Sequence, residues 1–70
     1  MHLRAVIADN VRAFRVAKSL KQEELADRAD LHPTYLSGIE NGRKNITVDL
    51  LERLAVALGV YEEDLVRRRR

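Results

Sequence analysis

Cysteine and tryptophan are absent from this 70-residue sequence, proline occurs once, glycine three times, and aromatic residues make up only 4%. Without cysteine, the chain has no disulfide, thiolate metal site or cysteine nucleophile, and it suits a reducing cytoplasm. The apolar runs are too short for a membrane span or for the core of a secretion signal. A core of Leu, Val, Ile and Ala, rarely interrupted by proline or glycine, favours packed helices over a sheet.

The charges are distributed unevenly, although the net charge is only +2. Residues 1–45 carry eight Lys or Arg against six acids, residues 46–66 carry Arg53 against five acids, and residues 67–70 are all Arg. One face is therefore expected to meet a polyanion while another does not. A chain of this length supports one small domain, which we place at residues 1–66, followed by a basic tail at 67–70. That tail is open to three interpretations: disorder, a non-specific nucleic-acid contact, or a countercharge to a partner subunit.

Apolar residues recurring at spacings of three and four predict five short helices. Their ends carry the expected local signals, namely proline in a first turn, threonine as an N-cap and glycine after a last turn. The expected helices are Leu3 to Lys18, Gln22 to Ala29, Pro33 to Asn41, a fourth from the N-cap Thr47 to Gly59, and Tyr61 to Val66.

The second and third expected helices are joined by three residues and have the residue types of a helix-turn-helix. Ala26 is small enough for the second helix to approach its neighbour, and Leu36 and Ile39 lie on the inner side of the third. The outward positions of the third helix are uncharged: Thr34, Tyr35, Ser37 and Gly38. Hydrogen-bond donors surround it: Lys21, Gln22, Asn41, Arg43, Lys44 and Asn45. Such a helix fits the major groove of B-DNA, with base contacts setting sequence and phosphate contacts setting position.

The sequences QEELA at 22–26 and LHPTYLSGIENGRKN at 31–45 resemble the phage-repressor and Cro (XRE) family of helix-turn-helix domains. Within that family, the pattern from Thr34 to Glu40, followed by a basic loop, is similar to the restriction–modification controller proteins. The resemblance implies an all-α, compact five-helix, lambda-repressor-like domain. It also implies a homodimer that binds double-stranded DNA at a palindromic operator.

The resemblance also implies roles for single residues. Gln22 would bind a phosphate and orient the recognition helix, Thr34 and Tyr35 would face the groove, and Ser37 would reach backbone or base. The loop residues would clamp phosphates: Asn41, Arg43, Lys44 and Asn45. Arg15 and Glu40 would form an ion pair that joins the first helix to the end of the third.

Two positions depart from the family pattern. Pro33 replaces a base-reading arginine of related controller proteins, and Gly38 replaces a glutamine common in phage repressors. His32, Thr34, DNA shape or bridging water are therefore expected to carry more of the specificity.

Each of these residues also has a purely structural interpretation. Gln22 fits a solvated helix start, His32 an N-cap, and Thr34 and Ser37 capping or surface positions. Tyr35 could pack its ring on the domain, and the basic loop could be an ordinary solvated loop. A metal site at His32 is not expected.

Apolar residues left over once the core is filled suggest a dimer surface away from the recognition helix: Val60, Tyr61, Leu65 and Val66. We expect a cytoplasmic, nucleoid-associated regulator without cofactor, metal or membrane contact, controlled by its concentration rather than by a small-molecule effector. The alternative is a protein-interaction module, antitoxin-like or an adaptor, that keeps the fold without using DNA. An enzyme is disfavoured because the serines lack suitable His and Asp partners and no phosphate-binding glycine loop exists.

Overall fold

The computed structural model describes residues 2–68, which form five α-helices and, within that range, no β-strand. The helices are α1 (Leu3–Ala17), α2 (Gln22–Arg28), α3 (Pro33–Glu40), α4 (Val48–Leu58) and α5 (Glu62–Val66). Each helix end lies within one residue of its expected position, which is the usual uncertainty of a helix boundary. The predicted all-α, five-helix fold is confirmed.

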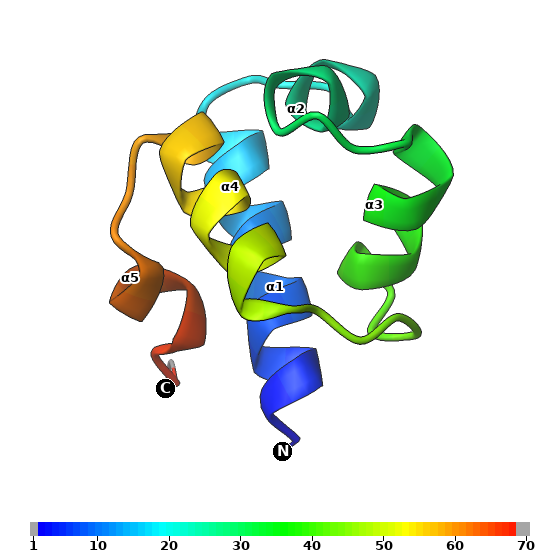
Figure 1. Ribbon diagram of the computed structural model, residues 1–70. Coiled ribbons are helices and arrows are strands. Elements are labelled where there is room, and N and C mark those ends of the chain that lie inside the picture. Colours follow the sequence, from blue (N-terminus) through cyan, green and yellow to red (C-terminus); the bar gives the residue numbers. More distant parts are fainter. Residues whose placement is uncertain (1, 69–70) are drawn as a thin grey trace.

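The helices are arranged around α1 (Figure 1). α1 contacts α3, α4 and α5, while α2 packs on α3 and α4. Figure 1 shows α3 and α5 on opposite sides of the central pair α1 and α4. The helix-turn-helix and the C-terminal helix therefore offer two separate surfaces.

The core is aliphatic, as the composition predicts. Its fully buried leucines come from four helices: Leu25, Leu36, Leu54, Leu58 and Leu65. Burying one such side chain contributes about 1.5–3 kcal/mol, so these positions dominate the stability of the domain. Ala26 is also fully buried, which confirms that a small residue lies where α2 meets its neighbours.

The local signals at the helix ends act as expected. The Thr47 hydroxyl accepts a hydrogen bond from the Leu50 amide at 3.1 Å, and Gly59 ends α4 at a φ of 70°. Gly42 follows α3 at a φ of 72°, a left-handed conformation that glycine adopts without steric cost. At the start of α3, His32 Nδ1 accepts from the Thr34 amide at 3.1 Å, so His32 is an N-cap.

Two apolar residues, Leu3 and Leu65, differ in burial from what their positions in the sequence suggest. Leu3 continues the apolar spacing of Ile7 and Val11 along α1 but is 48% exposed, because it is the first residue of the helix. Leu65 was expected on an exposed dimer stripe but is fully buried. α5 packs against both α1 and α4 and turns Leu65 into the core between them.

A buried asparagine joins α1 to the C-terminal end of α5. Asn10 is only 2% exposed, and its Nδ2 donates to the carbonyls of Leu65 at 2.9 Å and Arg67 at 2.8 Å. Carbonyls at a helix C-terminus lack hydrogen-bond donors within the helix, and Asn10 on α1 provides the missing donor. The first residue of the basic tail is thus tied to the domain, while Arg69 and Arg70 lie outside the described residues.

Candidate nucleic-acid interface

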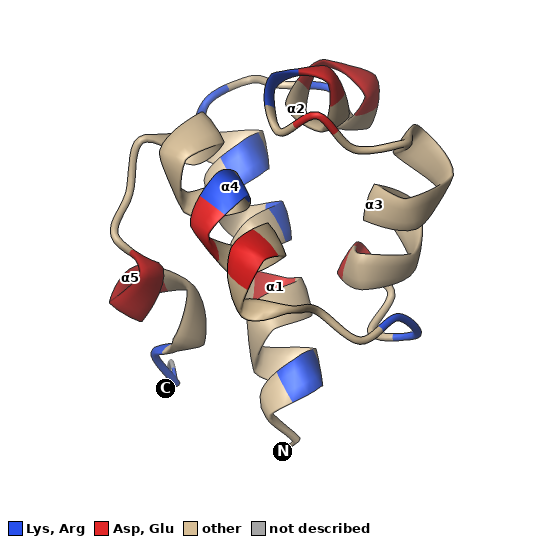
Figure 2. Ribbon diagram, in the orientation of Figure 1, with Lys and Arg blue, Asp and Glu red and all other residues tan. Residues whose placement is uncertain are grey.

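The N-terminal part of α3 presents an uncharged surface to solvent. His32, Pro33 and Thr34 are exposed, whereas Leu36 and Ile39 are buried against the core. Figure 2 shows α3 without charge except at its last turn, while acidic residues gather on α2, α4 and α5. A long charged side chain is therefore absent from the part of α3 that the sequence assigns to the groove.

The last turn of α3 is held by a buried ionic network centred on Glu40, which is 1% exposed. Arg15 donates to both carboxylate oxygens, from Nε at 2.8 Å and from Nη2 at 2.9 Å, so the predicted ion pair is present in bidentate form. Arg15 Nη1 also donates to the Leu20 carbonyl at 2.9 Å. Bidentate pairing fixes orientation as well as distance, and the network therefore sets the angle of α3 on α1.

Gln22 belongs to the same network. It starts α2, and its Nε2 donates to Glu40 Oε1 at 3.1 Å. The side chain is half-buried, so it differs from the solvated helix start that was the alternative interpretation. The contact supports the orienting role expected for Gln22, whereas its contact with a phosphate stays a prediction.

The loop after α3 is anchored to α3 by Tyr35. The Tyr35 hydroxyl donates to the Asn45 carbonyl at 2.8 Å, and Lys44 Nζ lies 6.0 Å from the centre of the Tyr35 ring. The half-buried ring packs against the core, as in the structural interpretation of this residue. Tyr35 therefore positions the loop with its hydroxyl already engaged, and any groove contact would come from its ring edge.

Gly38 faces the same loop rather than open space. A Cβ at this position would lie 2.5 Å from Lys44 Cγ, and the Gly38 carbonyl accepts from the Arg43 amide at 2.9 Å. Its lack of a side chain therefore lets the Lys44 stem lie along α3. Sequence reasoning assigned Gly38 to the groove; the structure adds this packing contact, and a groove contact of Gly38 stays a prediction.

The remaining candidate residues lie around α3. Ser37 is half-buried. The other phosphate candidates are exposed: Lys21, Asn41, Arg43, Lys44 and Asn45. The two cations Arg43 and Lys44 and the side-chain amide of Asn45 thus lie together next to the last turn of α3, where they are exposed to a polyanion.

Sequence reasoning missed two arginines of α1 that meet this region. Arg12 Nη2 donates to the Glu40 carbonyl at 2.6 Å, and an Arg4 guanidinium nitrogen donates to Asn45 Oδ1. With Arg15, they lie within about 80° of arc on one face of a helix of 3.6 residues per turn. The sequence shows that these arginines share one face of α1. It does not show that this face meets α3 and the loop after it.

The surface expected for dimerisation is only partly exposed. Tyr61 is 73% exposed, Val60 and Val66 are half-buried against the core, and Leu65 belongs to the core itself. Val56, on α4, is 78% exposed and was not assigned. Of the four assigned residues, Tyr61 is therefore the one that is largely exposed, and Val56 is an exposed apolar residue of α4 that the sequence analysis did not include.

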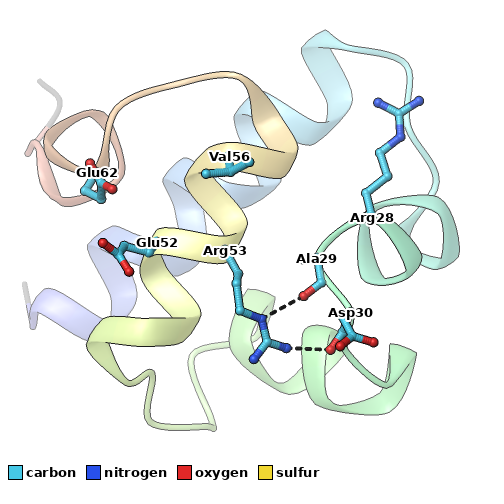
Figure 3. A pocket seen from close by; sticks show the side chains of 7 residues that line it. All are labelled: Arg28, Ala29, Asp30, Glu52, Arg53, Val56 and Glu62. Carbon is cyan, nitrogen blue, oxygen red and sulfur yellow. Dashed lines mark hydrogen bonds between the residues drawn. The ribbon is translucent and has the colours of Figure 1, made fainter.

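A pocket of about 590 Å³ lies between the end of α2, α4 and the start of α5 (Figure 3). Arg53 crosses one side of it, with Nε donating to the Ala29 carbonyl at 2.9 Å and Nη2 to the Asp30 carbonyl. These bonds satisfy carbonyls at the C-terminal end of α2. None of the candidate nucleic-acid residues lines this pocket, and Arg53 acts on the fold.

No described helix is long and apolar enough to cross a membrane. Within residues 2–68, no three side chains of His, Asp or Glu gather in a way that could hold a metal ion.

Comparison with known proteins identifies the relatives of the chain. Control protein C.BamHI of Bacillus amyloliquefaciens is 42% identical over 66 residues, which cover 93% of this chain and 82% of the relative. The crystal structure of a hypothetical transcription factor from Neisseria superposes with a TM-score of 0.91 at 47% identity, covering 94% of this chain and 76% of that one. The restriction-modification controller protein C.Esp1396I was solved as a tetramer with its natural 35 base-pair operator. It superposes with a TM-score of 0.85 at 31% identity, covering 93% of this chain and 86% of that one.

The family model described as helix-turn-helix matches residues 11–65. This range contains the Glu40 network, the uncharged surface of α3 and the basic loop. The chain therefore belongs to the helix-turn-helix family of phage-repressor and Cro (XRE) type, and it is similar to restriction–modification controller proteins.

Proposed function

We propose that this protein is a sequence-specific DNA-binding transcriptional regulator of the controller type, acting as a homodimer on a palindromic operator. One observation carries the proposal: exposed Arg43 and Lys44 follow directly on α3, whose outward surface is uncharged, and helix and loop are fixed to the domain by Glu40 and Tyr35. Small polar groups suit base edges in the major groove, and cations beside them suit phosphates. This function places the protein on the nucleoid in the cytoplasm and gives it no catalytic role.

The relatives support the same function. C.Esp1396I, which shares the fold at 31% identity, has been solved as a tetramer on its operator, and C.BamHI is likewise a control protein. In a dimer of this chain, two α3 helices would enter successive major grooves about 34 Å apart, and the operator would share the two-fold symmetry.

Selection of binding sites from a random pool of DNA duplexes tests the proposal. We expect an enriched palindrome whose half-sites are separated by about one helical turn. Failure to enrich any duplex at low salt would refute the regulator and favour the protein-interaction alternative.

Lys44 and Thr34 are expected to act on different properties of binding. Lys44→Gln keeps the aliphatic stem against Gly38 but removes the charge, so it should weaken binding to all duplexes. It should also lower the slope of log K against log salt concentration by about 0.9. Thr34→Ala should leave that slope unchanged and relax preference at one base pair by about 1–3 kcal/mol. Titrations at several salt concentrations, against selected and scrambled duplexes, measure both. An unchanged slope in Lys44→Gln would remove Lys44 from the phosphate contacts.

Tyr61 is expected to contribute to the dimer surface. It is 73% exposed, and an exposed aromatic side chain is a frequent source of binding energy at protein interfaces. Tyr61→Ala should weaken dimerisation by at least about tenfold, or 1.4 kcal/mol, as measured by sedimentation equilibrium. Val48→Ala is the matched control, because Val48 is 78% exposed at the other end of α4. Equal dimerisation of Tyr61→Ala and wild type would place the interface elsewhere.

A further inference from the structure

The N-terminal turn of α1 adds an arginine to the basic loop from a distant part of the sequence. An Arg4 guanidinium nitrogen donates to the side-chain oxygen of Asn45, 41 residues further along the chain. Asn45 is itself anchored on α3, because its carbonyl accepts from the Tyr35 hydroxyl at 2.8 Å. Arg4 is therefore held beside the exposed cations Arg43 and Lys44.

The charge of Arg4 is not used inside the fold, in contrast to that of Arg15. Arg15 is neutralised by the Glu40 carboxylate, whereas the Arg4 guanidinium meets the neutral side chain of Asn45. Asn45 is a neutral acceptor and engages only part of the guanidinium, which carries five N–H donors. Arg4 is exposed, so its remaining N–H donors can reach a ligand.

Space for a ligand lies next to this guanidinium. A hollow of about 410 Å³ is lined by His2, Arg4, Ala5 and Gly42, between the start of α1 and the loop. None of these lining residues is acidic. In Figure 2, the start of α1 and the loop after α3 each carry a basic segment, and both lie in the lower part of the view.

We propose that Arg4 is a further DNA-phosphate contact, which extends the loop Arg43–Asn45 onto the start of α1. The inference rests on the proposed function, because it assigns the hollow to a backbone phosphate of the bound duplex. Arg4 uses one side of its guanidinium to hold Asn45 and presents the remaining donors to the phosphate oxygens. Contacts of this kind add affinity for every sequence and depend on salt.

The test is the salt dependence of duplex binding by Arg4→Gln. Loss of one phosphate contact should lower the slope of log K against log salt by about 0.9, and weaken binding about eightfold at 0.1 M salt. Arg4→Lys, which keeps the charge but not the fork of donors, should retain most of the slope. The thermal midpoint of both variants should stay near that of the wild type, because the side chain is exposed.

Arg28→Gln is the matched control, since Arg28 is an exposed arginine that lines the pocket of Figure 3. It removes the same charge and should leave the slope nearly unchanged. An unchanged slope in Arg4→Gln would show that Arg4 only positions Asn45, and an equal loss in Arg28→Gln would show an effect of net charge; either result overturns the inference. Binding of no duplex by the wild-type protein would instead refute the proposed function and the inference with it.

Discussion

Glu40→Gln should lower the free energy of unfolding by about 3 kcal/mol, near the lower end of the cost of breaking a buried ion pair. The substitution keeps the shape of the side chain but removes the charge that Arg15 requires. It also places an amide N–H₂ group among the donors of Arg15 and Gln22, which all point at this carboxylate. The lower end of the range applies because the Arg15 side chain is 15% exposed and can recover some hydration.

Thermal and denaturant unfolding measure this effect. For a domain of this size, 3 kcal/mol corresponds to a fall of about 12–24 °C in Tm, a large part of a total stability of roughly 4–10 kcal/mol. Glu23→Gln makes the same chemical change at an exposed position of α2 and should stay within about 0.5 kcal/mol of wild type.

A double-mutant cycle with Arg15→Met separates the ion pair from general damage to the fold. Removing both charges should cost less than the sum of the two single substitutions, because neither partner is then left unpaired. Additive losses would mean that Glu40 and Arg15 act independently. Since the pair sets the angle of α3, Glu40→Gln should also weaken DNA binding at temperatures where it remains folded.

Asn10→Asp is expected to have the second-largest effect, a loss of about 2–4 kcal/mol. The carboxylate that replaces the amide cannot donate to the Leu65 and Arg67 carbonyls, which lie 2.9 and 2.8 Å from Nδ2. Two carbonyls lose their donor while a buried charge faces them, and burial of an unsatisfied polar group costs about 1–3 kcal/mol, more for a charged one. Urea denaturation measures the loss, and Asn41→Asp, at an exposed position, should stay within about 0.5 kcal/mol.

The damage from Asn10→Asp should be concentrated at α5. Hydrogen exchange at amides of residues 62–67 should accelerate more than exchange in α2 and α3, which contact other parts of the domain. Dimerisation should weaken with it, because Tyr61 and Val66 flank or belong to α5. Uniform loss of protection across all five helices would show that Asn10 supports the whole core rather than this helix.

Much of the candidate site could be predicted from the sequence, since its outward positions follow from helical period and residue type. Thr34 and His32 are exposed, and the cations of the loop lie beside α3. The pairing of Arg15 with Glu40 was implied instead by the resemblance to the helix-turn-helix family. The packing contact of Gly38 could not be predicted, because a glycine carries no information about the side chain that lies over it. The position of Lys44 explains why residue 38 has no side chain.

Leu65 shows where periodicity fails. α5 has five residues, little more than one turn at 3.6 residues per turn, so the pattern does not resolve an inner from an outer face. Which apolar residue enters the core then depends on how α5 packs against α1 and α4. Leu65 enters the core, while Tyr61 stays exposed.

The five helices and their ends follow from local sequence, because caps, proline and left-handed glycine act through bonds between near neighbours in the chain. The contacts of Arg4 with Asn45 and of Asn10 with Arg67 span 41 and 57 residues and arise when the helices pack. A polar side chain on a helix has many possible partners, and the packing angle of the helices selects among them. That angle depends on the whole core at once, so no local pattern contains it.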